Sequence, residues 1–437
     1  MTSRRLLQTT FRRASAAWAI TLALTFAILT ARFVSAQTAT AIHSFSGPDG
    51  DYPAAGLVID KAGNLYGTTF AGGSGPCMNL LGQAGCGTVF KLARKGSGWI
   101  LTVLYSFTGG NDGALPQNGI ITLAADGTLY GTTSAGGGGS CSLYGVSGCG
   151  TVFSLRPPPS RPASAFTPWI EKILYSFTGG SDGYSPTGGP VLDQAGNLYG
   201  AAGSYPQYGN IYELTPSGGG SWTHSIVHAF SGPDGWSPIG NLAIDKNGNL
   251  YGTTLYSDDG SGGGVVFQLA PSGSGWTETV LHDFTSQFGS DGGRPQAGVI
   301  IDSSGNVFGV TSNAGKYGGG TVFELSPSGN SWTFSIIDYI GAPGDCGPYD
   351  NLLMDQVGNM YGTTLCGGGY QRGDIFKLKP LQGGGWESGE LYAFRGAPDD
   401  GGYPLSNVVM DANGNLYGTG SVGGAHGLGD IFELKPD

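Results

Sequence analysis

The sequence repeats a five-residue motif whose first copy is Gly63-Asn64-Leu65-Tyr66-Gly67. Three further copies are identical and three others differ at one or two positions, so the motif occurs seven times. Its aromatic position is filled in turn by Tyr66, Tyr130, Tyr199, Tyr251, Phe308, Tyr361 and Tyr417. Neighbouring copies lie 52 to 69 residues apart. A period of this size in a strand-rich unit is typical of propellers and not of helical solenoids.

Each repeat contains four short runs with the composition of β-strands. In the first repeat the runs are Gly56–Asp60, Asn64–Thr69, Gly87–Leu92 and Trp99–Phe107, and we name them strands a, b, c and d. A tight Asp-x-x-Gly-Asn turn joins strand a to strand b, and a glycine-rich loop follows strand b. Apolar residues that recur with a short period between Gly, Pro, Asn and Asp indicate strands and turns. The repeat therefore predicts a blade of four antiparallel strands.

The first 36 residues have the layout of a signal peptide. Four arginines precede an apolar run at residues 14–30, and the small-x-small site Val34-Ser35-Ala36 stands before Gln37. This order of charged, apolar and cleavage regions predicts export and removal of residues 1–36. A retained N-terminal anchor is the alternative, although the apolar run is slightly short for a spanning helix. We expect the mature protein, without a later membrane span, to be secreted, periplasmic or on the cell surface.

The two ends of the mature chain predict a closed ring. The chain starts with a lone strand d, Ala41–Phe45, and its last strand is a strand c, Asp430–Leu434. In a ring, the N-terminal strand completes the last blade and no sheet edge stays open. The sequence therefore predicts an all-β, seven-bladed β-propeller over residues 37–437, and an open β-solenoid is the alternative.

Six cysteines agree with export, because an even number of cysteines in an exported chain indicates disulfides. Local pairing is the simplest of the connectivities that six cysteines allow. There is no Cys-x-x-Cys motif and no nearby histidine at ligand spacing, so a zinc site is disfavoured. The expected neighbours are Cys77 with Cys86, Cys141 with Cys149, and Cys346 with Cys366.

Three motifs in combination resemble a known family. They are Gly-Asn-Leu-Tyr-Gly-Thr-Thr, Gly-Thr-Val-Phe-x-Leu and Leu-Tyr-Ser-Phe-Thr-Gly-Gly-x-Asp-Gly. Together they are similar to the bacterial GloVer tandem repeat, named for Gloeobacter and Verrucomicrobia, over essentially all of the mature chain. The resemblance implies export. It implies no established activity, and it supplies no catalytic residues.

The predicted topology puts the d–a and b–c loops on one rim of the propeller, which we call the variable rim. The a–b turns on the opposite rim are nearly uniform, whereas the b–c loops differ most between repeats and carry most of the cysteines. Varied loops on a uniform scaffold favour a binding face. The alternative is that the disulfides only hold glycine-rich loops in place.

Most d–a loops share an Asp-Gly pair followed by proline. Seven carboxylates near a channel mouth would suit Ca²⁺, attract a cationic ligand or supply an acid/base pair for sugar chemistry. The stronger interpretation is a turn, because Asp binds local amides and Gly accepts positive φ. No other cofactor is indicated. The aspartates are Asp49, Asp112, Asp182, Asp234, Asp291, Asp345 and Asp400, with Asp399 as an alternative to the last.

Histidines do not indicate a catalytic or metal site. His43, His228 and His282 stand at the strand-d position that holds tyrosine in other repeats, and only His426 falls in a loop of the variable rim. There is no His-Glu-x-x-His motif. We therefore assign no catalytic residue.

Three functions fit these features. The favoured one is an exported, monomeric, non-enzymatic protein that binds a glycan or a surface protein through the variable rim. A secreted polysaccharide hydrolase or lyase using rim carboxylates is the first alternative, and a structural envelope protein is the second. A catalytic site should break the repeat symmetry, and the sequence shows no such polar cluster beyond the cysteine loops. The net charge of −11 argues against nucleic acid as a ligand.

Overall fold

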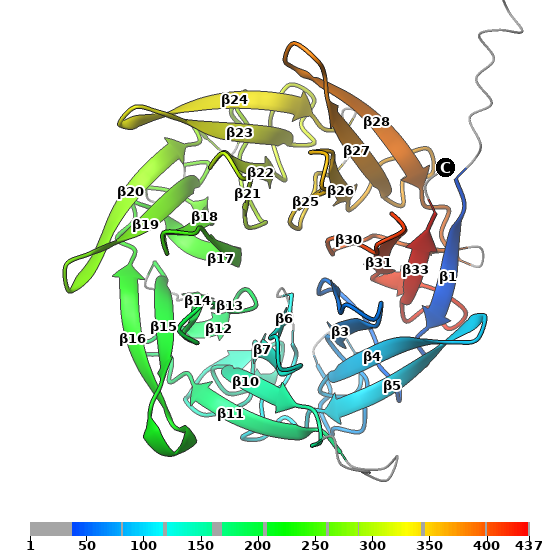
Figure 1. Cartoon of the computed structure of the whole chain (residues 1–437). Helices are drawn as coiled ribbons and strands as arrows, with labels where there is room; N and C mark the ends of the chain where they lie inside the picture. The colour runs from blue at the N-terminus through cyan, green and yellow to red at the C-terminus, as the bar shows by residue number, and fades with distance from the viewer. Residues whose placement is uncertain are drawn as a thin grey trace, which may run out of the picture. The chain divides into compact units, whose positions relative to one another are not determined.

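Seven antiparallel sheets follow one another around a ring, as the blades of a β-propeller (Figure 1). In each sheet the four strands pair in the order a, b, c, d from the axis outwards, and the third sheet has a fifth strand. The fold was thus predicted correctly from the repeat.

The computed structural model describes residues 37–435, apart from 80–81, 117–119, 160–167, 204–207, 259–261, 287, 342–345 and 398–399. The predicted signal peptide, residues 1–36, lies outside the described residues. Within the described part, no helix is long and apolar enough to cross a membrane.

The strands have the following bounds. Strands a are β2 (Val58–Ile59), β6 (Thr122–Leu123), β13 (Val191–Leu192), β17 (Trp236–Ile244), β21 (Ile300–Ile301), β25 (Leu353–Met354) and β30 (Val409–Met410). Strands b are β3 (Leu65–Thr69), β7 (Leu129–Thr133), β14 (Leu198–Gly203), β18 (Leu250–Tyr256), β22 (Val307–Thr311), β26 (Met360–Thr364) and β31 (Leu416–Gly420).

The outer strands are longer. Strands c are β4 (Thr88–Lys95), β10 (Thr151–Arg156), β15 (Asn210–Pro216), β19 (Val265–Ser272), β23 (Thr321–Ser328), β27 (Asp374–Pro380) and β33 (Asp430–Leu434). Strands d are β5 (Gly98–Ser106), β11 (Ile170–Ser176), β16 (Trp222–Ala229), β20 (Gly275–Asp283), β24 (Ser331–Tyr339), β28 (Trp386–Ala393) and β1 (Ala39–Ser44). The loops add β8 (Ser142–Leu143), β9 (Val146–Ser147), β12 (Tyr184–Pro186), β29 (Gly401–Gly402), β32 (Val422–Gly423) and a 3₁₀ turn, η1 (Gly218–Gly220).

Strand a is shorter than predicted. In the first blade the sequence predicts Gly56–Asp60, but β2 covers only Val58–Ile59. The chain before β2 leaves the sheet to pack between blades: a Cβ on Gly56 would lie 1.9 Å from Asn407 Oδ1 and 2.7 Å from Ile120 Cγ1. Contacts around the axis therefore replace strand pairing at this point.

The last glycine of the repeated motif makes room for an aromatic ring. All five residues of β3 are buried, and a Cβ on Gly67 would lie 2.7 Å from Phe90 Cζ of strand c. The same clash would occur between Gly131 and Phe153, and between Gly418 and Phe432. Glycine is thus required here by a close approach and not by its backbone angles.

Aromatic pairs join neighbouring blades. The phenylalanine that follows strand d packs edge-on against the strand-c aromatic ring of the next blade, as Phe107 does with Phe153, with ring centres 5.2 Å apart. The tryptophan at the start of strand d packs on the motif tyrosine of the preceding blade, as Trp276 does on Tyr199 at 5.7 Å. Such contacts add specific geometry to apolar burial.

The N-terminal strand closes the ring, as predicted. β1 pairs antiparallel with β33, with Ala41 opposite Phe432 and His43 opposite Ile431 (Figure 1). Phe45 follows β1, is fully buried and packs on Phe90 of the first blade at 5.4 Å. Arg94 of the first blade also donates a hydrogen bond of 2.5 Å to Glu433 of the last blade. An open solenoid is therefore excluded.

Replacing Phe45 should weaken ring closure. We expect Phe45→Ala to lower the free energy of unfolding by about 3–5 kcal/mol, because it removes a buried ring and leaves a cavity. The measurement is equilibrium unfolding in urea. As a control, Phe288→Ala removes a ring that is 87% exposed, and it should change stability by less than about 0.5 kcal/mol. Equal effects of the two substitutions would contradict this role of Phe45.

Candidate functional site

The segments that precede strands a pack closely around the axis. A Cβ on Gly188 would lie 2.2 Å from Gly240 O, and one on Gly298 would lie 1.9 Å from Asn241 O. Threonines of strand b fix these segments from the neighbouring blade, as Thr253 Oγ1 donates to Ala297 O at 2.6 Å. The axial segments are therefore held by backbone contacts between blades.

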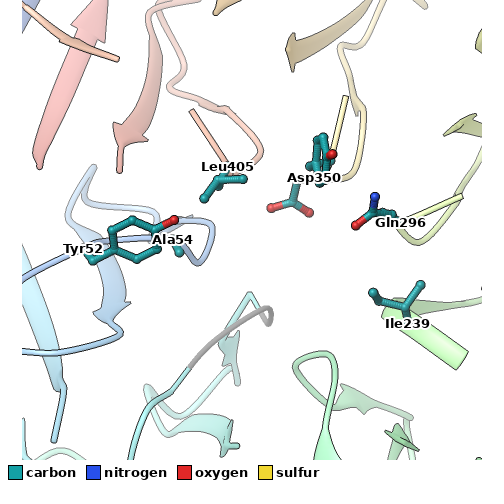
Figure 2. A pocket seen from close by; sticks show the side chains of 8 residues that line it. Tyr52, Ala54, Ile239, Gln296, Asp350 and Leu405 are labelled. Carbon is teal, nitrogen blue, oxygen red and sulfur yellow. The ribbon is translucent and has the colours of Figure 1, made fainter. Parts of the chain in front are cut away.

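A cavity of about 170 Å³ opens between these segments. Figure 2 shows its side chains, which come from different blades and surround one open space. All of them belong to the chain between strands d and a or to the start of strand a, and so to the variable rim. The lining residues are Tyr52, Ala54, Ile239, Gly240, Gln296, Tyr349, Asp350 and Leu405.

Blade six breaks the repeat symmetry in this cavity. Asp350 stands five residues before the aspartate of the a–b turn, where five other blades have Ala55, Gly188, Gly240, Ala297 and Ser406. Tyr349 precedes it, at the position of Ala54 and Gln296. The sequence analysis missed both residues. Aligning the repeats on the a–b turn, rather than on the Asp-Gly pair, would have revealed the single carboxylate.

Asp350 is a partly buried carboxyl held from two sides. Its Oδ1 accepts a hydrogen bond from the amide of Asn351 at 2.7 Å, and its Oδ2 accepts one from the amide of Asn407 in blade seven at 2.8 Å. Burial nevertheless raises the pKa of Asp350 to about 6. It is the only carboxylate among the described residues that line the cavity. Such a group accepts hydrogen bonds from ligand hydroxyls or amines.

The predicted rim aspartates have a structural environment. Asp112 accepts hydrogen bonds from Tyr105 OH at 3.0 Å and from the amide and hydroxyl of Thr108 at 2.8 and 2.6 Å. Histidine takes the place of the tyrosine in other blades, and His43 Nε2 lies 2.9 Å from Asp49 Oδ2. This strand-to-loop contact recurs at Asp49, Asp112, Asp182, Asp234, Asp291 and Asp400.

These contacts also set the charge of the aspartates. Burial alone would raise the pKa of Asp182, but hydrogen bonds from Thr178 and Tyr175 outweigh it and hold that pKa below its usual value. The aspartates are spread around the rim, and in the described part of the chain no three His, Cys, Asp or Glu residues are grouped to hold a metal ion. Asp345 and Asp399 lie outside the described residues. His426 is exposed on the b–c loop of blade seven.

Three disulfides restrain the variable rim, with the expected pairs Cys77–Cys86, Cys141–Cys149 and Cys346–Cys366. The first two lie within b–c loops. The third joins the d–a and b–c loops of blade six, four residues before Asp350. The covalent link therefore fixes the segment that carries the unique carboxylate.

The variable rim also carries exposed aromatic rings. Of the described residues, five aromatic side chains are exposed, and each lies in a b–c or d–a loop. They come from loops that differ in sequence, so no repeat pattern marks them. The five are Tyr144, Tyr208, Phe288, Tyr317 and Tyr370.

Comparisons with known proteins agree with the repeat and the fold. The model of the Gloeobacter/Verrucomicrobia repeat matches residues 29–201, 139–291 and 277–437. A search of curated proteins found no match.

Solved structures are similar at low sequence identity. A putative 6-phosphogluconolactonase from Bacteroides uniformis has a TM-score of 0.50 at 14% sequence identity. The match covers 79% of this chain and 86% of the chain of that protein. PorZ, a surface component of the type-IX secretion system of Porphyromonas gingivalis, has a TM-score of 0.49 at 16% sequence identity. The match covers 90% of this chain and 47% of the chain of PorZ. At this identity the similarity concerns the fold alone.

The raised pKa of Asp350 predicts a pH-dependent contribution to stability. Between about pH 4 and pH 6 the unfolded chain loses this proton while the folded chain keeps it, so rising pH destabilises the fold, and above about pH 6 the effect is constant. The free energy of unfolding of Asp350→Asn, relative to that of wild type, should therefore rise by about 1–2 kcal/mol between about pH 4 and pH 7. This is less than the full pKa shift would give, because the carboxyl is partly exposed.

Urea unfolding of wild type and of Asp350→Asn across this pH range measures the difference in their free energies of unfolding. The titration of all other groups contributes equally to both proteins and cancels. Asp126→Asn is the matched control, because a hydrogen bond from the amide of Thr128 lowers the pKa of Asp126. That variant should lose stability relative to wild type as the pH rises. A pH-independent difference between wild type and Asp350→Asn would contradict the assignment.

Proposed function

The chain belongs to the Gloeobacter/Verrucomicrobia repeat family, and we propose that it is an exported binding protein that recognises a polysaccharide through the variable rim. The observation that carries the proposal is the axial cavity, in which Tyr349 and Asp350 replace the residues of the other blades. The scaffold does not require these two residues, because the other blades fold without them. Such a difference in a cavity near the axis is expected of a ligand site.

The surroundings of the cavity support a sugar ligand. Tyr52 and Tyr349 supply rings with a hydroxyl, while Gln296 and Asp350 supply hydrogen-bonding groups. The exposed rings at Tyr144, Tyr208, Phe288, Tyr317 and Tyr370 extend apolar faces around the same rim. A polymer longer than the cavity can therefore contact both. Aromatic faces with polar tips are common at such wet, partly apolar interfaces.

Disulfides support the export part of the proposal. Three of them form among the described residues, and the described part contains no free cysteine. Structural disulfides persist in oxidising compartments such as the periplasm and the extracellular space.

Binding is favoured over hydrolysis by the number of carboxylates. Glycoside hydrolysis ordinarily uses two carboxyl groups on opposite sides of the scissile bond. The described lining of the cavity contains one. A secreted hydrolase or lyase is the second candidate, because a carboxyl with a pKa of about 6 suits proton transfer near neutral pH.

The test is a binding assay beside a cleavage assay. The mature protein, residues 37–437, should retard in gels that contain a soluble polysaccharide, and it should release no reducing ends from the same polymers. Tyr349→Ala and Asp350→Asn should each weaken binding by about tenfold. This is the loss in affinity expected when one aromatic contact or one charge-assisted hydrogen bond to the ligand is removed. Glu387→Gln, an exposed change on the outer strand β28, is the control and should bind as wild type does.

Cleavage that disappears in Asp350→Asn would instead favour the hydrolase or lyase. Absence of both binding and cleavage across neutral and acidic polysaccharides would contradict both functions, and would favour a structural envelope protein.

A further inference from the structure

Two arginines and two tyrosines form a compact group where blade six meets blade seven. Tyr370 and Arg372 lie in the b–c loop of blade six, and Arg395 and Tyr403 lie in the d–a loop that leads into blade seven. We call these four residues the arginine–tyrosine cluster. It lies on the variable rim.

The contacts of the cluster cross between the two loops. The Arg372 guanidinium lies 5.2 Å from the centre of the Tyr403 ring, and Arg372 Nη1 donates a hydrogen bond of 2.8 Å to Tyr403 OH. The Arg395 guanidinium lies 5.8 Å from the centre of the Tyr370 ring. Each loop therefore contributes one cation and one ring, and each cation lies over the ring of the other loop.

A backbone hydrogen bond and the Asp400 carboxylate hold the two loops in this arrangement. The amide of Tyr403 donates to Arg372 O at 2.7 Å. Asp400 accepts hydrogen bonds from the amides of Arg395 and Gly396 at 2.9 and 2.7 Å. The first contact joins the two loops, and the contacts of Asp400 fix the start of the d–a loop. The backbone that carries both arginines is therefore held in place.

No described carboxylate forms an ion pair with the two arginines of the cluster. Arg372 and Arg395 are both exposed. The nearby Asp400 is 3% exposed and directs its oxygens to Tyr392 and to the loop amides. In a chain of net charge −11, an exposed pair of cations is a local exception that suits an anionic ligand.

We propose that the arginine–tyrosine cluster binds carboxylate groups of an acidic polysaccharide, a polymer that contains uronic acids. This inference rests on the proposed function and names the ligand class. The planar guanidinium group matches a carboxylate with two parallel hydrogen bonds, and the tyrosine rings offer faces and hydroxyls to the sugar.

The position of the cluster suits a chain that reaches the axis. Leu405, which Figure 2 shows at the axial cavity, follows Tyr403 by two residues, so the two sites are adjacent in sequence along one loop. A third exposed cation, Lys316, lies 5.0 Å from the ring centre of Tyr317 on the b–c loop of blade five. These three exposed cations therefore lie on the rim of blades five to seven.

The test compares two forms of one polymer. The mature protein is titrated with polygalacturonate and with its fully methyl-esterified form, which has the same backbone without the charge. We expect polygalacturonate to bind about tenfold tighter or more, and this preference should shrink as the salt concentration rises.

Variants then locate the site. Arg372→Gln with Arg395→Gln should remove the preference for the charged polymer, so that both forms bind alike. Arg372→Lys with Arg395→Lys keeps the charge but not the planar fork, and should retain only part of the preference. Arg156→Gln, which removes an exposed arginine at the end of β10 on the opposite rim, is the matched control and should bind as wild type does.

The outcomes separate this inference from the proposed function. Binding of neutral polymers without preference for polygalacturonate, or a preference that survives in Arg372→Gln with Arg395→Gln, would overturn the acidic ligand and keep the polysaccharide-binding function. Binding of polyglutamate but of no polysaccharide would overturn both in favour of an acidic protein segment. Failure to bind any of these polymers would also overturn both.

Discussion

The close approach of a glycine to an aromatic ring is the constraint on which the propeller depends. In each blade the last glycine of the repeated motif lies under the strand-c ring, and in blade three Gly200 lies under Tyr212. The absence of a side chain lets the ring point back over strand b, where it meets the residue that follows strand d of the preceding blade, a phenylalanine in six blades and Ile340 in blade five. Glycine at this position therefore permits both the packing within a blade and the contact between blades. For this reason the motif can be read in all seven repeats.

The architecture could be predicted because its determinants are local and repeated. The motif, the Asp-x-x-Gly-Asn turn and the unpaired strand at Ala41–Phe45 are sufficient to count the blades and to close the ring. The length of strand a could not be predicted in the same way. Whether Gly56 stays in the sheet depends on Asn407 and Ile120, which belong to other blades.

The candidate site was less accessible from sequence for a related reason. The rim aspartates can be found in the sequence because they repeat. They repeat because each accepts a hydrogen bond that joins strand d to the following loop. Asp350 occurs once, and its significance appears only when the axial segments of all blades are superposed. The pairs Arg372–Tyr403 and Arg395–Tyr370 join loops that have no common pattern, so only the folded arrangement brings them together. The disulfides are the exception, because short spacing alone indicated their partners.

The pairing of β1 with β33 has a consequence for the way this protein reaches its native state. The two strands stand at opposite ends of the described chain, so their contact has nearly the largest sequence separation that the fold allows. Contacts of this kind carry a high entropic cost of loop closure and slow the final step of folding. A chain still leaving the ribosome lacks β33 until every other strand of the propeller has been made, so the ring closes only after them. The order in which the strands are made therefore delays closure of the ring.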